Sequence, residues 1–487
     1  MNLSRQGHSD RFGNPRSSAS PIAANLKAGH RIGRFKWTLI FALLAISLGA
    51  SQLQAGADSI AWHKDKQSVD ADISTWDVRQ LLEHVAAATG WRVYLDPNAV
   101  HNVSAKFKNL NTGEALHSLL GDLNFVVVPQ TNGPSQLYVF RTARGQATRL
   151  IAPVRKPAEP IPNQLVVTLK PGSKTKIDDL ARSLNAKVIG RMDAQHAYLL
   201  QFQDDAATQA ASAQLANNPD VANTGFNYPI DATPTLAGTD SANPALQLKP
   251  KSSGNNQLVV GLIDTPVQSL GSSLDAFIKP EINVAGDVTP STSITHGTAM
   301  AETILDALQK TTGGSTSVMI QPVNVYGNSE STSTFNVAQG IVAAVNSGAN
   351  IINLSLGGTG DSQVLHDTIN QVIQQGIPIY AAAGNEPVTT PTFPAAYAGV
   401  ISVTATDSTG NLASYANRGS FVDMTAPGDN VVSYNGLSYQ VQGTSTSTAF
   451  VSGTAAGLAD VAKASASQAE SLLQQTLPKS SILKTPQ

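Results

Sequence analysis

The sequence predicts a multidomain α/β protein in which a large domain with a parallel β-sheet follows two small α+β domains. The chain has 487 residues, more than a single domain usually holds. Two proline-rich stretches, residues 151–163 and about 229–250, divide it into three blocks. In the last block, short apolar runs alternate with amphipathic helical patterns, which is typical of a parallel sheet covered by helices on both faces.

The expected boundaries follow from these divisions. They are a targeting segment at 1–57, a small domain at 58–150, a linker at 151–163, a second small domain at 161–231, a linker at 232–250, the large domain at 245–470 and a tail at 471–487.

Composition excludes several classes of protein. The net charge is −2 and the sequence pI is about 6.5, and basic residues form no long block, so we expect no nucleic-acid partner. The chain has no cysteine, which excludes disulfides, thiolate nucleophiles and cysteine-ligated metals. Apolar residues make up 41% of the chain, enough for more than one core.

The N-terminal segment has the layout of a secretory signal peptide. Three basic residues precede the apolar run 37–50, and Ala55-Gly56-Ala57 offers a cleavage site with small residues. The run has 14 residues, whereas a membrane-spanning helix needs about 20. We therefore expect export, and the alternative is an uncleaved membrane anchor.

The first block predicts an α+β domain. Helical spacing of apolar residues predicts a helix near 77–90, and Asn111 with Glu114 predicts the capped start of another. Strands are expected at 91–97, 104–110, 124–131 and 136–143. The pattern resembles the small N-terminal domain shared by secretins and TonB-dependent receptors, which implies a docking partner in a cell envelope. The alternative is a generic module without a specific partner.

The second block has the order β-α-β-β-α-β, which is the ferredoxin-like arrangement. Strands are expected at 164–172, 187–192, 196–203 and 221–230, and helices at 176–186 and 205–219. This arrangement by itself indicates no function.

The third block supplies the parallel sheet. Buried strands are expected at 258–264, 317–326, 349–358, 377–385 and 399–407, and helices between them at 334–348 and 361–376. In sheets of this kind, functional sites form at the carboxyl ends of the strands.

Four polar residues stand at ends of elements in this block. Asp264 and Asn385 each end a predicted strand, His296 begins a predicted helix, and Ser445 lies where Gly443-Thr444 meets another helix. A serine hydroxyl needs a base to act as a nucleophile, histidine can supply it, and a carboxylate orients the histidine. A side-chain amide can stabilise the oxyanion.

The strings around these residues carry a resemblance. They are LIDT, HGT, AAGN and GTS, supported in order by SLGG, PAAY and APG. With the order Asp, His, Ser, the block is identified as a member of the subtilisin-like serine peptidases, the subtilases. The resemblance implies a serine endopeptidase with Asp264, His296 and Ser445 as its triad and Asn385 as oxyanion donor.

The resemblance also implies how substrate and propeptide bind. Ser355, Leu356, Gly357 and Gly358 would form an edge strand for an extended protein or peptide substrate. Ala382, Ala383 and Gly384 would line a pocket. The strings LVVTLKPG, AKVIG and PDVANTGFNYPI make the second block resemble the inhibitory propeptide of these enzymes. The chain's own propeptide would then be its intramolecular inhibitor, removed by autocleavage between about Tyr228 and Ala245.

Three residues depart from the family pattern, namely Pro266, Glu302 and Ala449. No compact acidic cluster forces a metal, so we expect no cofactor, although calcium is possible in the family. We expect an exported protein, in the periplasm or envelope or outside the cell.

The sequence also has two rival interpretations. A non-catalytic binding protein would retain the fold as a scaffold, but the intact set of Asp264, His296, Asn385 and Ser445 argues against it. A serine-carboxyl peptidase would carry a glutamate where this chain has His296. The histidine therefore excludes a serine-carboxyl peptidase.

Overall fold

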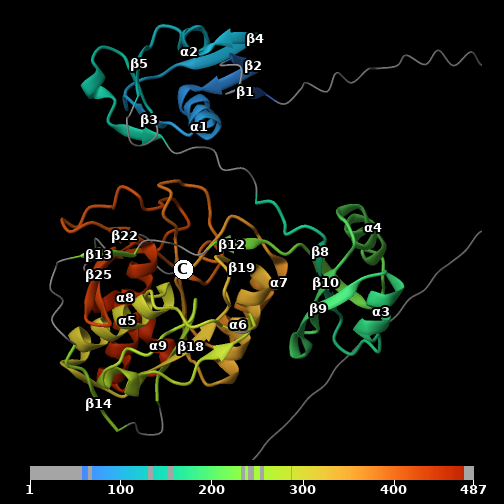
Figure 1. Ribbon diagram of the computed structural model, residues 1–487, viewed down its shortest axis with the longest axis vertical. Coiled ribbons are helices and arrows are strands. Elements are labelled where there is room, and N and C mark those ends of the chain that lie inside the picture. Colours follow the sequence, from blue (N-terminus) through green and yellow to red (C-terminus); the bar gives the residue numbers. More distant parts are fainter. Residues whose placement is uncertain are drawn as a thin grey trace, which may run out of the picture. The chain divides into compact units, whose positions relative to one another are not determined.

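The computed structural model (Figure 1) describes residues 58–63, 68–129, 135–151, 158–231, 236–239, 246–252, 257–286 and 288–476. The predicted signal peptide at 1–57 lies outside the described residues, as does the tail from residue 477. In the part of the chain that is described, no helix is both long and apolar enough to cross a membrane.

In its described residues, the first domain contains two small sheets and two α-helices. The predicted helices are α1 (Val78–Thr89) and α2 (Thr112–Leu120), and the Asn111 side chain accepts a hydrogen bond from Glu114 N, as expected of an N-cap. One sheet has the order β1-β2-β4 and the other β5-β6-β3-β7. Their strands are β1 (Ser59–His63), β2 (Ser68–Asp77), β3 (Arg92–Leu95), β4 (Asn102–Asn111), β5 (Asn124–Val128), β6 (Gln136–Phe140) and β7 (Arg149–Ile151). Strands β1, β2 and β7 were not predicted.

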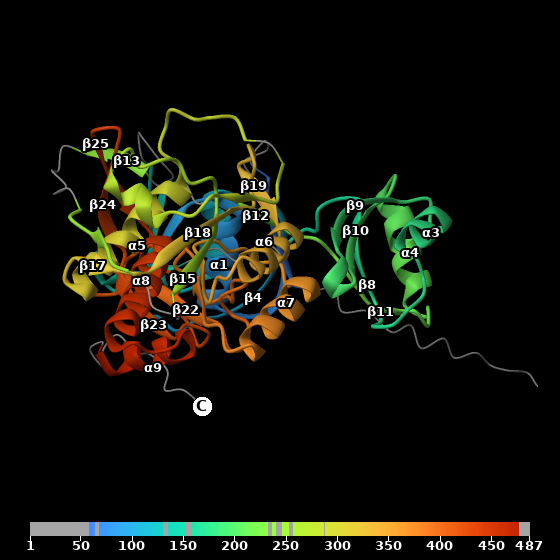
Figure 2. The ribbon, with the colours of Figure 1, turned by 90° about the horizontal axis from the view of Figure 1, so that it is seen from below.

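The second domain confirms the predicted β-α-β-β-α-β order. Its antiparallel sheet runs β11-β8-β10-β9, and in Figure 2 both helices lie on one face of it. The elements are β8 (Gln164–Leu169), α3 (Ile177–Ser183), β9 (Lys187–Met192), β10 (Ala197–Gln201), α4 (Asp205–Leu215) and β11 (Val221–Gly225).

The last strand predicted for this domain was wrong in one respect. Residues 221–230 were expected as a single strand, but the structure ends β11 at Gly225 and begins a separate strand, β12 (Pro229–Asp231). Strand β12 pairs antiparallel with β19 (Ser331–Ser333), which belongs to the large domain. The apolar pattern continues through both strands, so the change of partner was invisible in the sequence.

The large domain is built on a parallel sheet, as predicted, and its described residues form seven strands of that sheet, two more than the five expected. Its order is β16-β18-β15-β20-β21-β22-β23, and every neighbouring pair is parallel. The strands are β15 (Val259–Asp264), β16 (Ile282–Asn283), β18 (Met319–Asn324), β20 (Ile351–Leu354), β21 (Ile379–Ala382), β22 (Ile401–Thr406) and β23 (Met424–Pro427).

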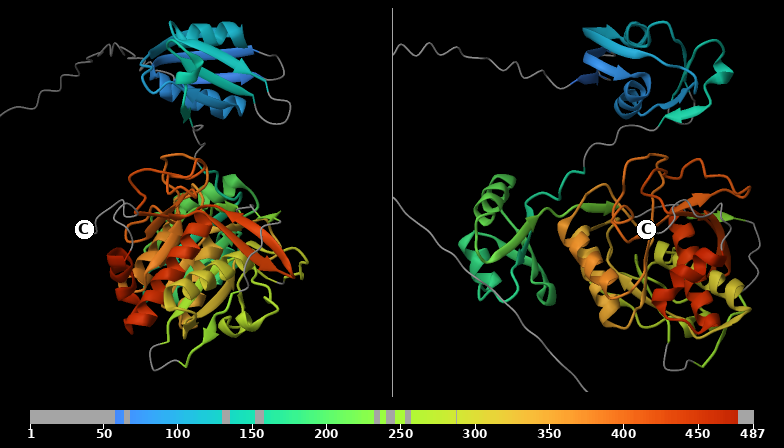
Figure 3. Two further views of the ribbon diagram at one scale, coloured as in Figure 1. Left: turned by 90° about the vertical axis from the view of Figure 1, so that its left-hand side faces the viewer. Right: turned by 180° about the vertical axis from the view of Figure 1, so that it is seen from behind.

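Helices cover both faces of this sheet (Figure 2). One face packs against α5 (His296–Thr312), α8 (Thr444–Ala462) and α9 (Ala466–Thr476), and the other against α6 (Thr334–Asn346) and α7 (Gln363–Gln374). Side chains of β15 alternate between the two faces. Leu262 lies in the core between the sheet and α5 and α8, and Ile263 lies in the core on the side of α6 and α7. Figure 3 shows α8 and α9, in red, lying together.

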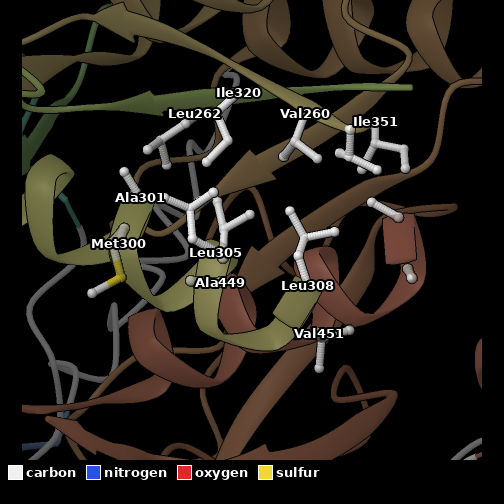
Figure 4. Packing of buried hydrophobic residues seen from close by; sticks show 14 of the residues in the cluster. Val260, Leu262, Met300, Ala301, Leu305, Leu308, Ile320, Ile351, Ala449 and Val451 are labelled. Carbon is white, nitrogen blue, oxygen red and sulfur yellow. The ribbon is translucent and has the colours of Figure 1, made fainter. Parts of the chain in front are cut away.

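The core between β15 and the helices α5 and α8 is closely packed. Figure 4 shows Val260, Leu262 and Ile320 of the sheet facing Leu305 and Leu308 of α5. All five side chains are fully buried. This packing holds the helix that begins at His296 against the strand that ends at Asp264.

A smaller antiparallel sheet precedes α8. Strands β24 (Asp429–Tyr434) and β25 (Leu437–Gln442) form a hairpin, and β13 (Leu236–Thr239) pairs with the other edge of β25. Strand β13, like β14 (Lys249–Pro250), lies in the stretch predicted as a linker, and β14 pairs with β17 (Ser315–Thr316). Part of the predicted linker is therefore bound to the large domain.

Candidate active site

The carboxyl ends of three neighbouring strands form the edge on which the candidate site stands. Leu262 of β15 pairs with Asn353 of β20, and Leu354 pairs with Ala381 of β21. This register places the end of β15, at Asp264, level with the ends of the other two strands. Two of the predicted residues, Ser355 and Asn385, follow those ends directly or within a few residues.

Asp264 and His296 form a buried pair. The distance between Asp264 Oδ1 and His296 Nδ1 is 2.8 Å, and Asp264 is 1% exposed. Burial lowers the pKa of His296, but the negative charge of Asp264 and the hydrogen bond raise it by more, so the net pKa lies above the usual 6.5. The pair therefore stabilises an imidazolium while orienting the ring.

The start of α5 is held close to the end of β15. Thr295 caps the helix through Thr298 N, and Gly297 N donates to Thr265 Oγ1 at 2.8 Å. A Cβ on Gly297 would lie 2.2 Å from the carbonyl oxygen of Thr265. Only glycine permits this approach, which explains the residue that follows His296.

Ser445 lies in the first turn of α8 and is linked to the end of β20. Its Oγ donates to the carbonyl of Ser355 at 2.9 Å, and Ser355 Oγ donates to the carbonyl of Ser445 at 3.0 Å. Asn353 donates in turn to Ser355 Oγ at 2.9 Å. The backbone N–H of Ser445 is among the first of the helix, where no intrahelical acceptor exists.

Asn385 is tied to the same turn of α8. Its Oδ1 accepts hydrogen bonds from Thr444 N at 2.8 Å and from Thr444 Oγ1 at 3.0 Å. This orientation leaves the amide nitrogen Nδ2 as the donor. Gly443 has φ +153°, and a Cβ there would lie 3.0 Å from Asn385 Nδ2. Glycine before Thr444 thus keeps the side chain of Asn385 in place.

The remaining predicted residues surround this edge. Leu356, Ala382 and Ala383 are buried, and Gly384 has φ +105° with the side chain of Asn417 directly against it. The edge strand expected at 355–358, which would pair with substrate, stays a prediction. Residues 355–357 lie beyond the end of β20, and Gly358 makes only a single bridge, to Phe393.

The chain leaving the second domain runs into this site. Thr334 N donates to the carbonyl of Tyr228 at 2.9 Å, and β12 continues along β19. Ile230 is 1% exposed, and Gly358 lies beside it, because a Cβ on Gly358 would be 3.5 Å from Ile230 Cγ1. Asp231 O accepts from the hydroxyl of Tyr326 at 3.5 Å.

Three positioning residues were missed from the sequence. Thr444 anchors Asn385, Asn417 donates to the carbonyl of Ala383 at 2.8 Å, and Gln268 accepts from Thr295 N at 2.9 Å and so supports the start of α5. Thr444 stands beside Ser445 in the sequence and could have been suspected. Asn417 and Gln268 carry no local signal, because their partners are set by the fold.

No group of three or more potential metal-ligating acidic or histidine side chains occurs within the described ranges.

Comparison with known proteins decides the family. Residues 255–485 match the Subtilase family (Peptidase_S8), and residues 146–227 match the Fervidolysin N-terminal prodomain. Thermitase of Thermoactinomyces vulgaris is 35% identical over 226 residues, which cover 45% of this chain and 81% of thermitase. Subtilisin Savinase of Lederbergia lenta is 37% identical over 188 residues, covering 36% of this chain and 70% of Savinase. The chain is a member of the subtilase family.

Solved structures agree on the fold of this subtilase. Fervidolysin from Fervidobacterium pennivorans, a keratinolytic enzyme related to subtilisin, matches with a TM-score of 0.51 at 18% identity, over 65% of this chain and 57% of fervidolysin. The epidermin leader peptide processing serine protease of Staphylococcus aureus matches with a TM-score of 0.50 at 18% identity, over 66% of this chain and 96% of that one. The subtilase is thus a serine-type endopeptidase made as a zymogen with a propeptide.

Glu302, one of the departures from the subtilase pattern, is a buried acid on α5. Its Oε2 accepts from Ser433 N of β24 at 2.6 Å. Burial raises its pKa from 4.5 to about 7; the hydrogen bond from Ser433 N opposes this rise, and the charge of Asp306 adds to it. Between these two pKa values the folded protein holds a proton on Glu302 that the unfolded chain has released, so the contribution of Glu302 to stability is lost as the pH rises from 4.5 to 7.

Glu302→Gln is expected to remove this loss. A shift of this size corresponds to at most about 3 kcal/mol, so the variant should melt at a higher temperature than its parent at pH 8 and at nearly the same temperature at pH 4.5. Thermal unfolding in a Ser445→Ala background, which prevents autolysis, checks this. Glu330→Gln, at an exposed glutamate, is the control. An equal effect of Glu302→Gln at both pH values would contradict the explanation.

Proposed function

We propose that this subtilase is an exported serine endopeptidase that hydrolyses peptide bonds through an acyl-enzyme on Ser445 and matures by cutting its own linker. The observation that carries the proposal is the convergence of Asp264, His296, Ser445 and Asn385 at one edge of the parallel sheet. Direct hydrogen bonds join Asp264 to His296 and Asn385 to the residue before Ser445.

In the first step, His296 Nε2 accepts the proton of Ser445 Oγ while that oxygen attacks the substrate carbonyl carbon. The hydroxyl must turn from the carbonyl of Ser355, to which it donates in this structure, toward the imidazole. Asp264 holds Nδ1 protonated and stabilises the imidazolium that forms. The imidazolium then protonates the leaving amine, and water releases the acyl group by the same steps.

The oxyanion of each tetrahedral intermediate would accept hydrogen bonds from Asn385 Nδ2 and from the backbone N–H of Ser445. Asn385 Oδ1 is held by Thr444, which supports the donor role of Nδ2. Donors fixed before the reaction begins cost no reorganisation when charge develops. The positive end of α8 adds to the same effect.

Substrate would bind as an extended chain along the path that the propeptide tail follows. The tail strand β12 pairs with β19, and its residue Ile230 lies beside Gly358. This supports Ser355 to Gly358 and Ala382 to Gly384 as substrate contacts and proteins as the substrate class. Strand pairing of this kind draws affinity from the main chain.

The propeptide would inhibit the enzyme until it is removed. Its sheet buries Met192, Ala197 and Leu199 in the same core as Phe335 of α6. Asn227 Oδ1 also accepts from Phe335 N at 3.0 Å, which caps the helix from the propeptide side. These contacts support an inhibitor that folds against α6 and delivers its tail to the cleft.

The first domain would direct the enzyme to a partner in the cell envelope, and the basic, apolar and small residues at the N-terminus favour export. Both parts of the proposal come from the sequence pattern.

Labelling with a fluorophosphonate tests the proposed function. The mature wild-type protein should hydrolyse casein, and a fluorophosphonate should stop hydrolysis and attach to the peptide that contains Ser445, as found by mass spectrometry. Folded protein free of its propeptide that neither hydrolyses casein nor takes up the probe would overturn the enzyme mechanism. Label on another serine would overturn the assignment of the nucleophile.

A further inference from the structure

The edge of β25 is occupied by a strand from the linker, and this carries a further inference that rests on the proposed function. We propose that β13 is a second self-inhibiting contact. It covers the edge of β25 along which the part of a substrate that follows the cleaved bond would pair, and it stays with the protease domain after the propeptide is cut away.

The geometry of β13 supports this. It runs antiparallel to β25 over four residue pairs, from Leu236 opposite Val441 to Thr239 opposite Ser438. Strand β25 ends at Gln442, and Gly443 and Thr444 lead directly to Ser445. The other edge of β25 is already paired with β24. The edge that β13 covers is thus the one that the hairpin leaves open near the nucleophile.

The direction of the chain decides on which side of a cut β13 falls. Strand β12 pairs with β19, and its last residue, Asp231, contacts Tyr326. Tyr326 stands two residues beyond Asn324, which pairs with Asp264, so β12 ends near the triad. Residue 236 follows five positions later, a distance of at most about 18 Å for an extended chain. The chain therefore pairs with β19 through β12 before the triad and with β25 through β13 after it.

Because β13 is covalently attached, it competes strongly with substrate for the edge of β25. A cut anywhere before Leu236 releases the propeptide but leaves β13 joined to the protease domain, because β13 lies on the carboxyl side of that cut. A strand held on a short linker acts at an effective concentration in the mM range. Removing the propeptide would then open the β19 side of the cleft, while the β25 side stays covered until β13 is displaced or trimmed.

Two kinds of substrate distinguish the β19 side of the cleft from the β25 side. A peptide p-nitroanilide has no residues after the cleaved bond and does not need β25, whereas a peptide with four residues after that bond would pair with it. The test measures kcat/KM for both substrates on wild-type mature enzyme and on two double variants, Leu236→Pro with Gly238→Pro and Ala237→Pro with Thr239→Pro. Proline removes the N–H that a strand donates.

Because alternate residues of an edge strand face its neighbour, one double variant breaks the pairing and the other, with the same number of prolines, is its matched control. The quantity compared is kcat/KM for the extended peptide divided by kcat/KM for the p-nitroanilide. We expect this ratio to rise about tenfold in one double variant, because β13 loses about two main-chain hydrogen bonds to β25. The ratio should stay near that of wild type in the other.

An equal ratio in all three enzymes, with the p-nitroanilide still hydrolysed, would overturn the inference and leave the proposed function standing. Absence of hydrolysis of both substrates by wild type would instead sink the proposed function. A measurement on wild type alone is independent of the variants: the N-terminal residue of the mature protein should fall at or before Leu236, and a first residue beyond Thr239 would overturn the inference.

Discussion

Replacing Ser445 with alanine is expected to lower kcat for peptide hydrolysis by about 10⁶-fold, a magnitude that comes from measurements on subtilisin itself rather than from this structure. The reason is that, in the proposed mechanism, the acyl bond forms on Ser445 Oγ. Two of the neighbouring hydroxyls in the first turn of α8 are already engaged. Thr444 Oγ1 is engaged with Asn385, and Ser447 Oγ donates to the carbonyl of Ala426 at 3.1 Å.

The full-length precursor gives the sharpest measurement of this effect. Wild-type precursor should convert to a shorter mature form during purification, whereas the Ser445→Ala precursor should remain intact by mass spectrometry. Ser447→Ala, two residues along the same helix, is the matched control and should mature. A Ser445→Ala precursor that matured in the absence of any other protease would refute autoprocessing.

Asp264→Asn is expected to lower kcat/KM by about 10⁴-fold, as for the equivalent change in other enzymes with this triad. Asp264 Oδ1 accepts from both His296 Nδ1 and Thr265 N, and Oδ2 is buried without a hydrogen-bond partner. The asparagine amide of D264N has two orientations. In the first its NH₂ group takes the place of Oδ2 and has no partner, and in the second the NH₂ group faces His296. In the second case the imidazole must take the tautomer that cannot accept the proton of Ser445.

The pH profile separates this explanation from simple unfolding. In the wild type, activity requires neutral His296, so kcat/KM should rise with pH through a midpoint above 6.5, the direction in which Asp264 shifts the pKa. In Asp264→Asn the midpoint should fall, because the charge that stabilises the imidazolium is gone. A residual activity whose midpoint does not move would argue that Asp264 has only a structural role.

Much of the fold could be predicted because its signals are local. Strand β15 is an uninterrupted apolar run that ends in Asp264, and the run alone predicts a buried parallel strand. In α6 the apolar residues Phe335, Ala338 and Ile341 recur at helical spacing, and all three are fully buried. Helical periodicity needs no knowledge of the partner, since any apolar stripe must be covered by something.

The candidate site could be predicted for a different reason. Asp264, His296, Asn385 and Ser445 lie in short strings whose residue types are set by chemistry and close approach, as at Gly297 and Gly443. Their roles were expected before the geometry was known. The orientation of Asn385 and the two hydrogen bonds that join Ser355 to Ser445 were not, because they depend on Thr444 and on the packing of α8 against β20.

The sequence by itself thus determined the order of the domains, the parallel sheet and the candidate reactive groups, since each depends on residues that are neighbours in the chain. Only the tertiary structure decided which strands the linker joins. Strand β12 pairs with β19 about a hundred positions away, and β13 with β25 about two hundred. Pairing at such separations depends on which edges the rest of the fold leaves open, and no local pattern records that.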